Sequence, residues 1–185
     1  MRDNSLTKLI LVCSLALILG LIIFQSDKFL RFKYRKTAKS HVMNGVVPDF
    51  RFYDLSNNLI TNNLFFKGRS LVIMHINTDC DMCSSKVKSL LKYIHEVEGA
   101  DIILSSSEDK NTLKTFHELN NLKNYPQIHL VQSESDFFYK NFGSSFIPLV
   151  LVFNHEGLLV KKIDDTVPIG TIIRYIKIAN NEGSK

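Results

Sequence analysis

Runs of apolar residues with two different periodicities divide the chain into predicted strands and helices. Residues 71–76 form an apolar run rich in β-forming residues, which predicts a buried strand. Over 87–97 the apolar residues recur at helical spacing, with lysines and a glutamate between them, so we expect a helix that begins near Cys80. The same patterns predict a second buried strand at 101–105 and a second helix at 113–120. Because the first helix is long enough for a right-handed crossover, we expect the two strands to be parallel neighbours.

Two antiparallel hairpins are predicted on either side of this central region. Residues 50–61 contain two short alternating runs around a polar turn. Residues 146–163 contain two apolar runs joined by a polar turn that ends in Gly157. These patterns indicate a mixed sheet, with both parallel and antiparallel neighbours.

One more strand and two more helices complete the predicted elements. A strand is expected at 127–131, a short helix with a glycine stop at 136–143, and a helix after Pro168 at 169–178. Gly99 follows the helix that begins near the cysteines, and we expect it to occupy a left-handed cap position there.

The apolar run from Leu9 to Phe24 predicts a membrane-spanning helix, since a span needs roughly 20 residues. No small-residue cleavage site follows the run, so we interpret it as an uncleaved anchor. The predicted organisation is given by four ranges: a transmembrane anchor at 1–26, a basic juxtamembrane linker at 27–45, one folded domain at 46–180 and a flexible tail at 181–185.

The net charge of +5 is concentrated before the folded domain. Residues 1–40 carry eight basic and two acidic side chains, which leaves a net charge of −1 for the remainder. We therefore expect no nucleic-acid partner for the domain, and a basic flank that lies on anionic lipid headgroups. Six basic residues follow the span and two precede it, so the positive-inside rule favours a cytoplasmic domain.

Cys80 and Cys83 lie at the junction between the predicted central strand and the helix that follows it. The unpaired N–H groups at a helix N-terminus stabilise a thiolate, so we expect Cys80 to be the nucleophile and Cys83 to resolve its mixed disulfides. No second cysteine pair or closely spaced histidine pair completes a zinc site, and we expect neither a metal nor a bound cofactor. A redox-active dithiol suits an oxidising compartment, and on that ground we favour a periplasmic or other extracytoplasmic location over a cytoplasmic one.

The predicted order of elements, with a proline entering the second hairpin, resembles the thioredoxin fold, a three-layer α/β/α sandwich with a mixed sheet, here preceded by one N-terminal transmembrane helix. More narrowly, the chain resembles the membrane-anchored thiol:disulfide oxidoreductases of the redoxin group (TlpA/AhpC-TSA-like) over about 46–180. The resemblance rests on four stretches: Pro48-Asp49-Phe50, Cys80-Asp81-Met82-Cys83, Ile147-Pro148 and the turn Phe153–Gly157. It implies that Pro148 is cis and faces the dithiol, and that the backbone of Ile147 pairs with substrate.

The chain departs from this family beside the first cysteine. Most relatives carry a tryptophan before that cysteine, where this chain has Asp79. Asp79 and Asp81 place negative charge next to Cys80, and we expect them to disfavour its thiolate and to make the pair a better reductant. His75, on the predicted central strand, is a candidate for proton transfer, and the alternative is a hydrogen-bonded packing residue.

The function predicted on these grounds is an enzyme that reduces protein disulfides through Cys80 and Cys83. Its partners would be a disulfide-containing protein substrate, an external thiol electron donor and, through the N-terminal helix, a membrane. Two alternatives remain open: a non-catalytic thioredoxin-fold binding module with a structural disulfide, and a thiol peroxidase. Asn77 stands where a peroxidase would need threonine or serine, which disfavours the second alternative.

Overall fold

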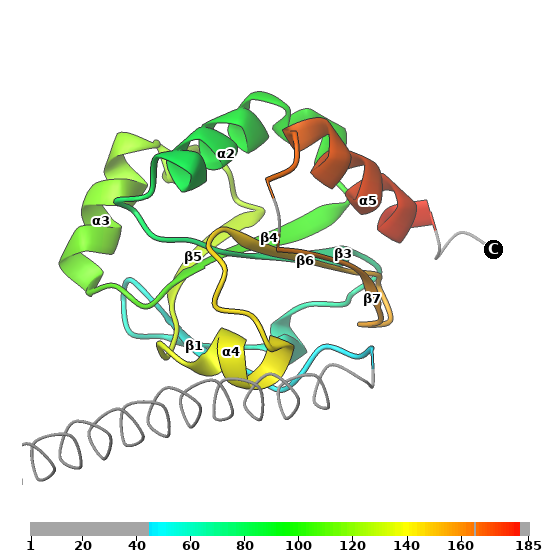
Figure 1. The fold of residues 1–185 in the computed structure, drawn as a ribbon, viewed down its shortest axis with the longest axis horizontal. Coiled ribbons are helices and arrows are strands. Elements are labelled where there is room, and N and C mark those ends of the chain that lie inside the picture. Colours follow the sequence, from blue (N-terminus) through cyan, green and yellow to red (C-terminus); the bar gives the residue numbers. More distant parts are fainter. Residues whose placement is uncertain (1–44, 165, 182–185) are drawn as a thin grey trace, which may run out of the picture.

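The computed structural model describes residues 45–164 and 166–181, which form a seven-stranded mixed sheet (Figure 1). The strand order is β2-β1-β5-β4-β3-β6-β7. Strands β3, β4 and β5 are parallel neighbours, whereas β6 is antiparallel to β3 and the two hairpins β1–β2 and β6–β7 close the two ends of the sheet. The predicted parallel pair and both predicted hairpins are therefore confirmed. The strands are β1 (Arg51–Asp54), β2 (Leu59–Thr61), β3 (Ser70–His75), β4 (Ala100–Ser106), β5 (Ile128–Gln132), β6 (Leu149–Phe153) and β7 (Leu159–Ile163).

Helices cover both faces of the sheet and give it three layers. Figure 1 shows α2, α3 and α5 on one face and the short α4 on the other. Gly143 ends α4 in the left-handed conformation, as its sequence predicts. The α-helices are α2 (Asp81–Lys92), α3 (Lys110–Leu119), α4 (Phe137–Phe142) and α5 (Ile169–Asn181), and the 3-10 helices are η2 (Asn62–Leu64), η3 (Ile94–Val97) and η4 (Leu122–Asn124).

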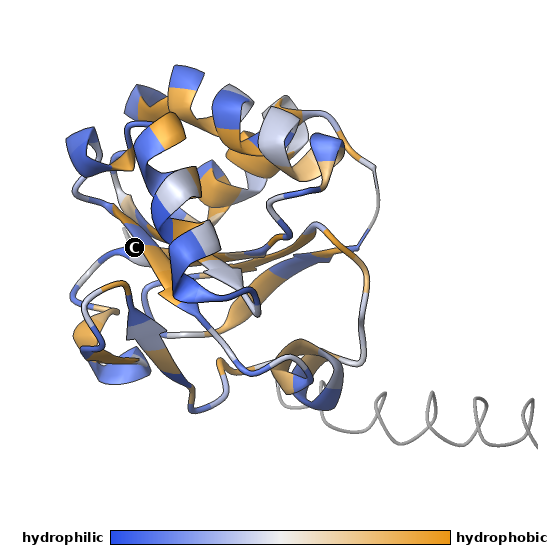
Figure 2. Ribbon diagram, turned by 90° about the vertical axis from the view of Figure 1, so that its left-hand side faces the viewer, coloured by the Kyte–Doolittle hydropathy of each residue, from blue (hydrophilic) through white to orange (hydrophobic). Residues whose placement is uncertain are grey.

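The central strand β3 is buried along its whole length and packs against a separate core cluster on each face. Val72 and Met74 belong to the cluster beneath α2 and α5, and that cluster includes Cys83. Leu71 and Ile73 belong to the second cluster, which is rich in phenylalanines from β1 and α4. Figure 2 shows the hydrophobic central strands between the two layers. The continuous apolar run thus reflects burial on both faces, which is typical of a central strand.

The predicted role of Gly99 is wrong. Helix α2 ends at Lys92, the 3-10 helix η3 follows it, and Gly99 is not among the residues with a positive φ. Its lack of a side chain matters for another reason, because a Cβ at this position would lie 2.7 Å from Nδ2 of Asn180 on α5. Glycine therefore suits position 99 because α5 approaches it closely, and not because the backbone there is left-handed.

The predicted anchor at 1–26 and all but the last residue of the linker at 27–45 lie outside the described residues, as do the tail residues after Asn181. Within the ranges 45–164 and 166–181, no helix combines the length and the apolar character that a membrane crossing requires.

The start of the predicted domain pairs with the β6–β7 turn. Val46 forms a β-bridge with Leu158, and the N–H of Val47 donates a hydrogen bond of 2.8 Å to the Gly157 carbonyl.

Candidate active site

Cys80 occupies the N-cap of α2, at the end of a short loop that follows β3. Its backbone is extended, with φ −90° and ψ 110°, and its sulfur accepts a hydrogen bond of 3.2 Å from the backbone N–H of Cys83. This is the position at which an electron-rich side-chain atom satisfies an unpaired helix N–H and meets the positive end of the helix dipole. The predicted strand-to-helix placement of the cysteines is confirmed.

The two sulfurs lie 2.7 Å apart and are not joined in a disulfide. Cys83 is fully buried, whereas Cys80 is partly exposed, so that reagents in solvent meet the first sulfur and not the second. Burial, reinforced by the hydrogen bond that its thiol donates to Cys80, raises the pKa of Cys83 to about 12. At neutral pH Cys83 therefore keeps its proton and shares it with the exposed sulfur.

Three residues that lie next to Cys80 along the chain, Asp79, Asp81 and Met82, are exposed. Asp79 and Asp81 both point to solvent, where water and salt screen their effect on the neighbouring sulfur. Met82 is 38% exposed, and its sulfur accepts a hydrogen bond of 3.7 Å from the hydroxyl of Thr166. The two carboxylates lie beside the dithiol as their sequence positions require, and their influence on its redox balance stays a prediction.

The loop before β6 lies at the same edge of the sheet as the loop before α2. Strands β3 and β6 are antiparallel and His75 pairs with Leu149, so the end of the first strand is next to the start of the second. The Ile147-Pro148 peptide bond is cis, as the resemblance implies. Ile147 packs against the same core cluster as Cys80, and this cluster includes Cys83. The loop before β6 and the loop before α2 therefore both adjoin the same end of the sheet and pack on the same core cluster.

His75 lies away from the dithiol, on the opposite face of the sheet. Along a strand, successive side chains alternate between faces, and Met74 already faces the cluster that contains Cys83. The imidazole of His75 stacks on Phe138 of α4 and lies 3.2 Å from the carbonyl of Ser105 through Nδ1. The structure does not bring His75 to the cysteines, and its contacts are those of a hydrogen-bonded packing residue.

Glu108 is a residue of this region that the sequence did not single out. It lies in the loop between β4 and α3, and its carboxylate accepts hydrogen bonds from both the backbone N–H and the hydroxyl of Thr78, two residues before Cys80. The sequence showed only a polar loop rich in residues that cap helices. A contact across 30 positions has no local signal, and it follows from the parallel pairing of β3 and β4.

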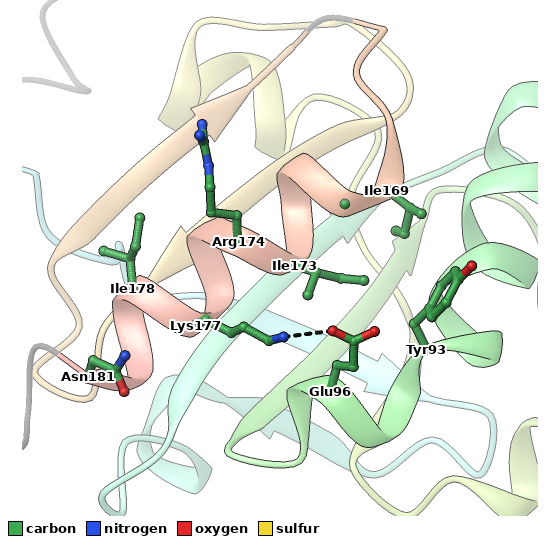
Figure 3. A pocket seen from close by; sticks show the side chains of 9 residues that line it. Tyr93, Glu96, Ile169, Ile173, Arg174, Lys177, Ile178 and Asn181 are labelled. Atoms are coloured by element: carbon green, nitrogen blue, oxygen red, sulfur yellow. Dashed lines mark hydrogen bonds and ion pairs between the residues drawn. The ribbon is translucent and has the colours of Figure 1, made fainter.

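A groove of about 530 Å³ lies between η3 and α5, at the other end of α2 (Figure 3). Lys177 and Glu96 form an ion pair of 2.6 Å across it, and Ile173 contributes to its apolar wall. Tyr93, which lines this groove, directly follows the last residue of α2. Because a helix rises about 1.5 Å per residue, this end of α2 lies about 18 Å from Cys80 at the other end. The groove is therefore separate from the dithiol.

Comparison with solved structures supports the thioredoxin-like fold that the sequence resembles. No protein-family model matches the sequence, and no curated protein matches it. A thiol:disulfide interchange protein of the thioredoxin family from Chlorobium tepidum TLS matches the structure with a TM-score of 0.58 and 15% identity, over 73% of this chain and 95% of that chain.

Two further solved structures are similar to this chain. A secreted disulfide oxidoreductase from Mycobacterium tuberculosis, homologous to Escherichia coli DsbE, has a TM-score of 0.59 and 11% identity over 70% of this chain and 95% of its own. A peroxiredoxin-like protein from Aquifex aeolicus has a TM-score of 0.60 and 13% identity over 72% of this chain and 85% of its own. The chain has a thioredoxin-like fold.

Proposed function

We propose that this chain is a membrane-tethered thiol:disulfide oxidoreductase that reduces protein disulfides through Cys80 and Cys83. The observation that carries the proposal is the pair of unjoined sulfurs, 2.7 Å apart at the N-terminus of α2, one partly exposed and one buried. An exposed sulfur can meet a large substrate, and a buried neighbour within bonding reach can release it.

In the first step, the Cys80 thiolate attacks one sulfur of the substrate disulfide. A new S–S bond joins Cys80 to the substrate, the substrate S–S bond breaks, and the second substrate sulfur leaves as a thiolate. The N–H of Cys83, 3.2 Å from the Cys80 sulfur, and the helix dipole stabilise the attacking thiolate.

In the second step, Cys83 loses its proton and attacks the sulfur of Cys80. The intramolecular disulfide forms, the mixed disulfide breaks, and the remaining substrate sulfur leaves as a thiolate that takes up a proton. The substrate gains two electrons and the Cys80–Cys83 pair loses two. An external thiol donor then reduces the Cys80–Cys83 disulfide and completes the cycle.

The loop at Ile147 and Pro148 is the proposed docking edge for the substrate chain. The pairing of β3 with β6 supports this role, because β6 starts at the end of the sheet where β3 ends and the loop to Cys80 begins. An extended segment of the substrate would pair with the backbone at Ile147, since β-strand addition supplies affinity through main-chain hydrogen bonds. Phe146, which is 38% exposed, adds an apolar contact at the same edge.

Reduction of insulin disulfides by the Cys80–Cys83 dithiol provides the test. The 185-residue chain carrying Cys13→Ser is compared with the same chain carrying Cys80→Ser or Cys83→Ser in addition. We expect turnover of insulin disulfides with dithiothreitol in the parent, loss of turnover in Cys80→Ser, and accumulation of a mixed disulfide in Cys83→Ser. A parent without turnover, or turnover that survives Cys80→Ser, would favour the non-catalytic binding module.

The proposed extracytoplasmic location needs its own experiment. A single cysteine at the exposed position Ser107 is introduced into a chain whose three native cysteines are serine. In intact cells a membrane-impermeant maleimide should label this cysteine and should not label one placed at Ser5, before the apolar run. The opposite labelling pattern would place the domain in the cytoplasm, as the basic flank favours.

A further inference from the structure

The carboxylate of Glu108 makes three hydrogen bonds with two other residues. Oε2 accepts from the backbone N–H of Thr78 at 2.8 Å and from the hydroxyl of Ser106 at 2.9 Å. Oε1 accepts from the hydroxyl of Thr78 at 2.8 Å. Hydrogen bonds to an ionised carboxylate are roughly twice as strong as those between neutral groups, so this cluster firmly joins the loop of Thr78 to the end of β4.

Glu108 is itself anchored by its own backbone. Its N–H donates to the hydroxyl of Ser106 at 3.2 Å, and its carbonyl accepts from the side-chain amide of Gln132 at 2.8 Å. Ser106 ends β4 and Gln132 ends β5, two parallel strands whose carboxyl ends share one edge of the sheet. The carboxylate that holds Thr78 is therefore fixed to the rigid part of the fold.

The loop between β3 and α2 has local bonds besides this long-range one. The N–H of Asp79 donates to the side chain of Asn77 at 2.8 Å, and the N–H of Cys80 donates to the carbonyl of Asn77 at 3.2 Å. These bonds shape the turn, but both partners move together with it. Two bonds link the loop to β4 and the residues after it: the N–H of Ile76, at the start of the loop, donates to the Ser105 carbonyl at 2.8 Å, and Glu108 holds Thr78, closer to Cys80.

We propose that Glu108 is a positioning residue for the dithiol, and that it holds the loop through Thr78 so that the sulfur of Cys80 stays within reach of Cys83. The inference rests on the proposed function, because it concerns a pair that cycles between dithiol and disulfide. Glu108 acts through Thr78 and has no contact of its own with the reacting sulfurs.

The consequence is a high effective concentration of Cys83 at the sulfur of Cys80. In the release step Cys83 attacks that sulfur within one molecule, and the rate and equilibrium of such a step depend on how well the two groups are held together. A loose loop would lower the effective concentration. The mixed disulfide would then persist, and exchange with a small thiol would favour the open dithiol over the closed disulfide.

Equilibration with reduced and oxidised glutathione measures this quantity directly. The 185-residue chain with Cys13→Ser is compared with chains that also carry Glu108→Ala, Glu108→Gln or the control Glu118→Ala, which removes an exposed carboxylate of α3. The readouts are the equilibrium constant between dithiol and disulfide, and the fraction of chain that carries glutathione on Cys80.

We expect Glu108→Ala to lower the equilibrium constant for disulfide formation about tenfold, which corresponds to a reduction potential about 30 mV higher. The glutathione-bound fraction should rise at the same time. Glu108→Gln retains an acceptor oxygen for the Thr78 N–H and should recover most of the parental constant. Glu118→Ala should match the parent.

Thr78→Val provides a second route if Glu108→Ala does not fold. It removes the hydroxyl bond to Oε1 and keeps the backbone bond to Oε2. It should lower the equilibrium constant for disulfide formation by about threefold, less than Glu108→Ala does, because only one of the carboxylate's three hydrogen bonds is lost. Parental values for both readouts in the folded Glu108 and Thr78 variants would overturn the positioning role. A parent that fails to reduce insulin while Glu108→Ala still shifts the glutathione equilibrium would refute the proposed function and leave the positioning role in place.

Discussion

The imidazole of His75 lies against the ring of Phe138, with 4.1 Å between the ring centroids and 18° between the ring planes. Only 5% of His75 is exposed. Because burial removes an imidazolium from water, it lowers the pKa of His75 to about 4, and the hydrogen-bonded carbonyl of Ser105 opposes this only in part. At neutral pH the ring is uncharged, and Nδ1–H donates to that carbonyl.

We predict that the protein loses stability as the pH falls from 6.5 to 4. The folded-state pKa of His75 lies below its unfolded value, so the unfolded chain binds a proton first and protonation favours unfolding. The contribution of uncharged His75 to the free energy of unfolding is fully present above pH 6.5 and is lost as the pH falls through the folded-state pKa. For a difference of this size the loss is roughly 3 kcal/mol, measured as the free energy of unfolding in urea at a series of pH values.

The variant His75→Phe is the control for this pH dependence. Phenylalanine keeps an aromatic ring against Phe138, and the carbonyl of Ser105 still accepts the N–H of Ile76 at 2.8 Å. The slope of stability against pH should become shallower without vanishing, because burial also lowers the pKa of His129. A slope identical to that of the parent would show that His75 does not cause it.

The elements that the sequence predicted well are those whose signals are local. The apolar run of β3, the helical spacing after Cys80 and the polar turn that ends in Gly157 each depend on a few neighbouring residues. These local signals were sufficient to place both cysteines at a strand-to-helix junction. The relative position of Ile147 came from the resemblance to a known family, since hydrophobic periodicity does not reveal which loops meet.

The features that the sequence did not predict depend on contacts between distant elements. Glu108 stands in a polar loop and holds Thr78 only because β3 and β4 pair in a particular parallel register. Gly99 faces Asn180, 81 positions further along the chain, and its sequence context suggested a turn instead. Only the packed sheet and helices identify these partners.

Gly99→Ala should destabilise the protein. The new methyl group would displace the side chain of Asn180, whose Oδ1 accepts a hydrogen bond of 2.6 Å from Ser70. Loss of that bond costs about 1 kcal/mol, which should lower the free energy of unfolding measured in urea. Asn180→Ala should lower the free energy of unfolding by less in the Gly99→Ala chain than in the parent, because the methyl group has already displaced the Asn180 side chain there.

Gly170→Ala is the matched glycine substitution. No heavy atom lies within 4 Å of a Cβ built at Gly170, its φ is not positive, and it lies in α5. Alanine should therefore stabilise the protein by about 0.5–1 kcal/mol through its higher helix propensity and the lower entropy of the unfolded chain. Equal effects of the two substitutions would contradict the proposed contact between Gly99 and Asn180.

Neutralising Asp79 and Asp81 should shift the equilibrium of the Cys80–Cys83 pair from the disulfide toward the dithiol. In the double variant Asp79→Asn/Asp81→Asn, the thiolate of Cys80 would lose two nearby negative charges that oppose it, and the disulfide would lose its relative advantage. Because both carboxylates are exposed, the expected decrease in the glutathione equilibrium constant is about threefold, and it should shrink in 1 M salt. An unchanged constant at low salt would remove the two aspartates from the redox balance.

The buried sulfur should resist alkylation while the protein is folded. With the pKa of Cys83 raised to about 12, about one molecule in ten thousand carries its thiolate at pH 8, and the side chain is fully buried as well. In the reduced chain with Cys13→Ser, iodoacetamide should add once in native buffer and twice in urea, as measured by intact mass. Cys83→Ser should react at the parental rate and Cys80→Ser about a hundredfold more slowly, because thiolate fraction and access set the rate. Equal rates for the two single-cysteine chains would contradict the assignment of Cys80 as the attacking sulfur and Cys83 as the resolving one.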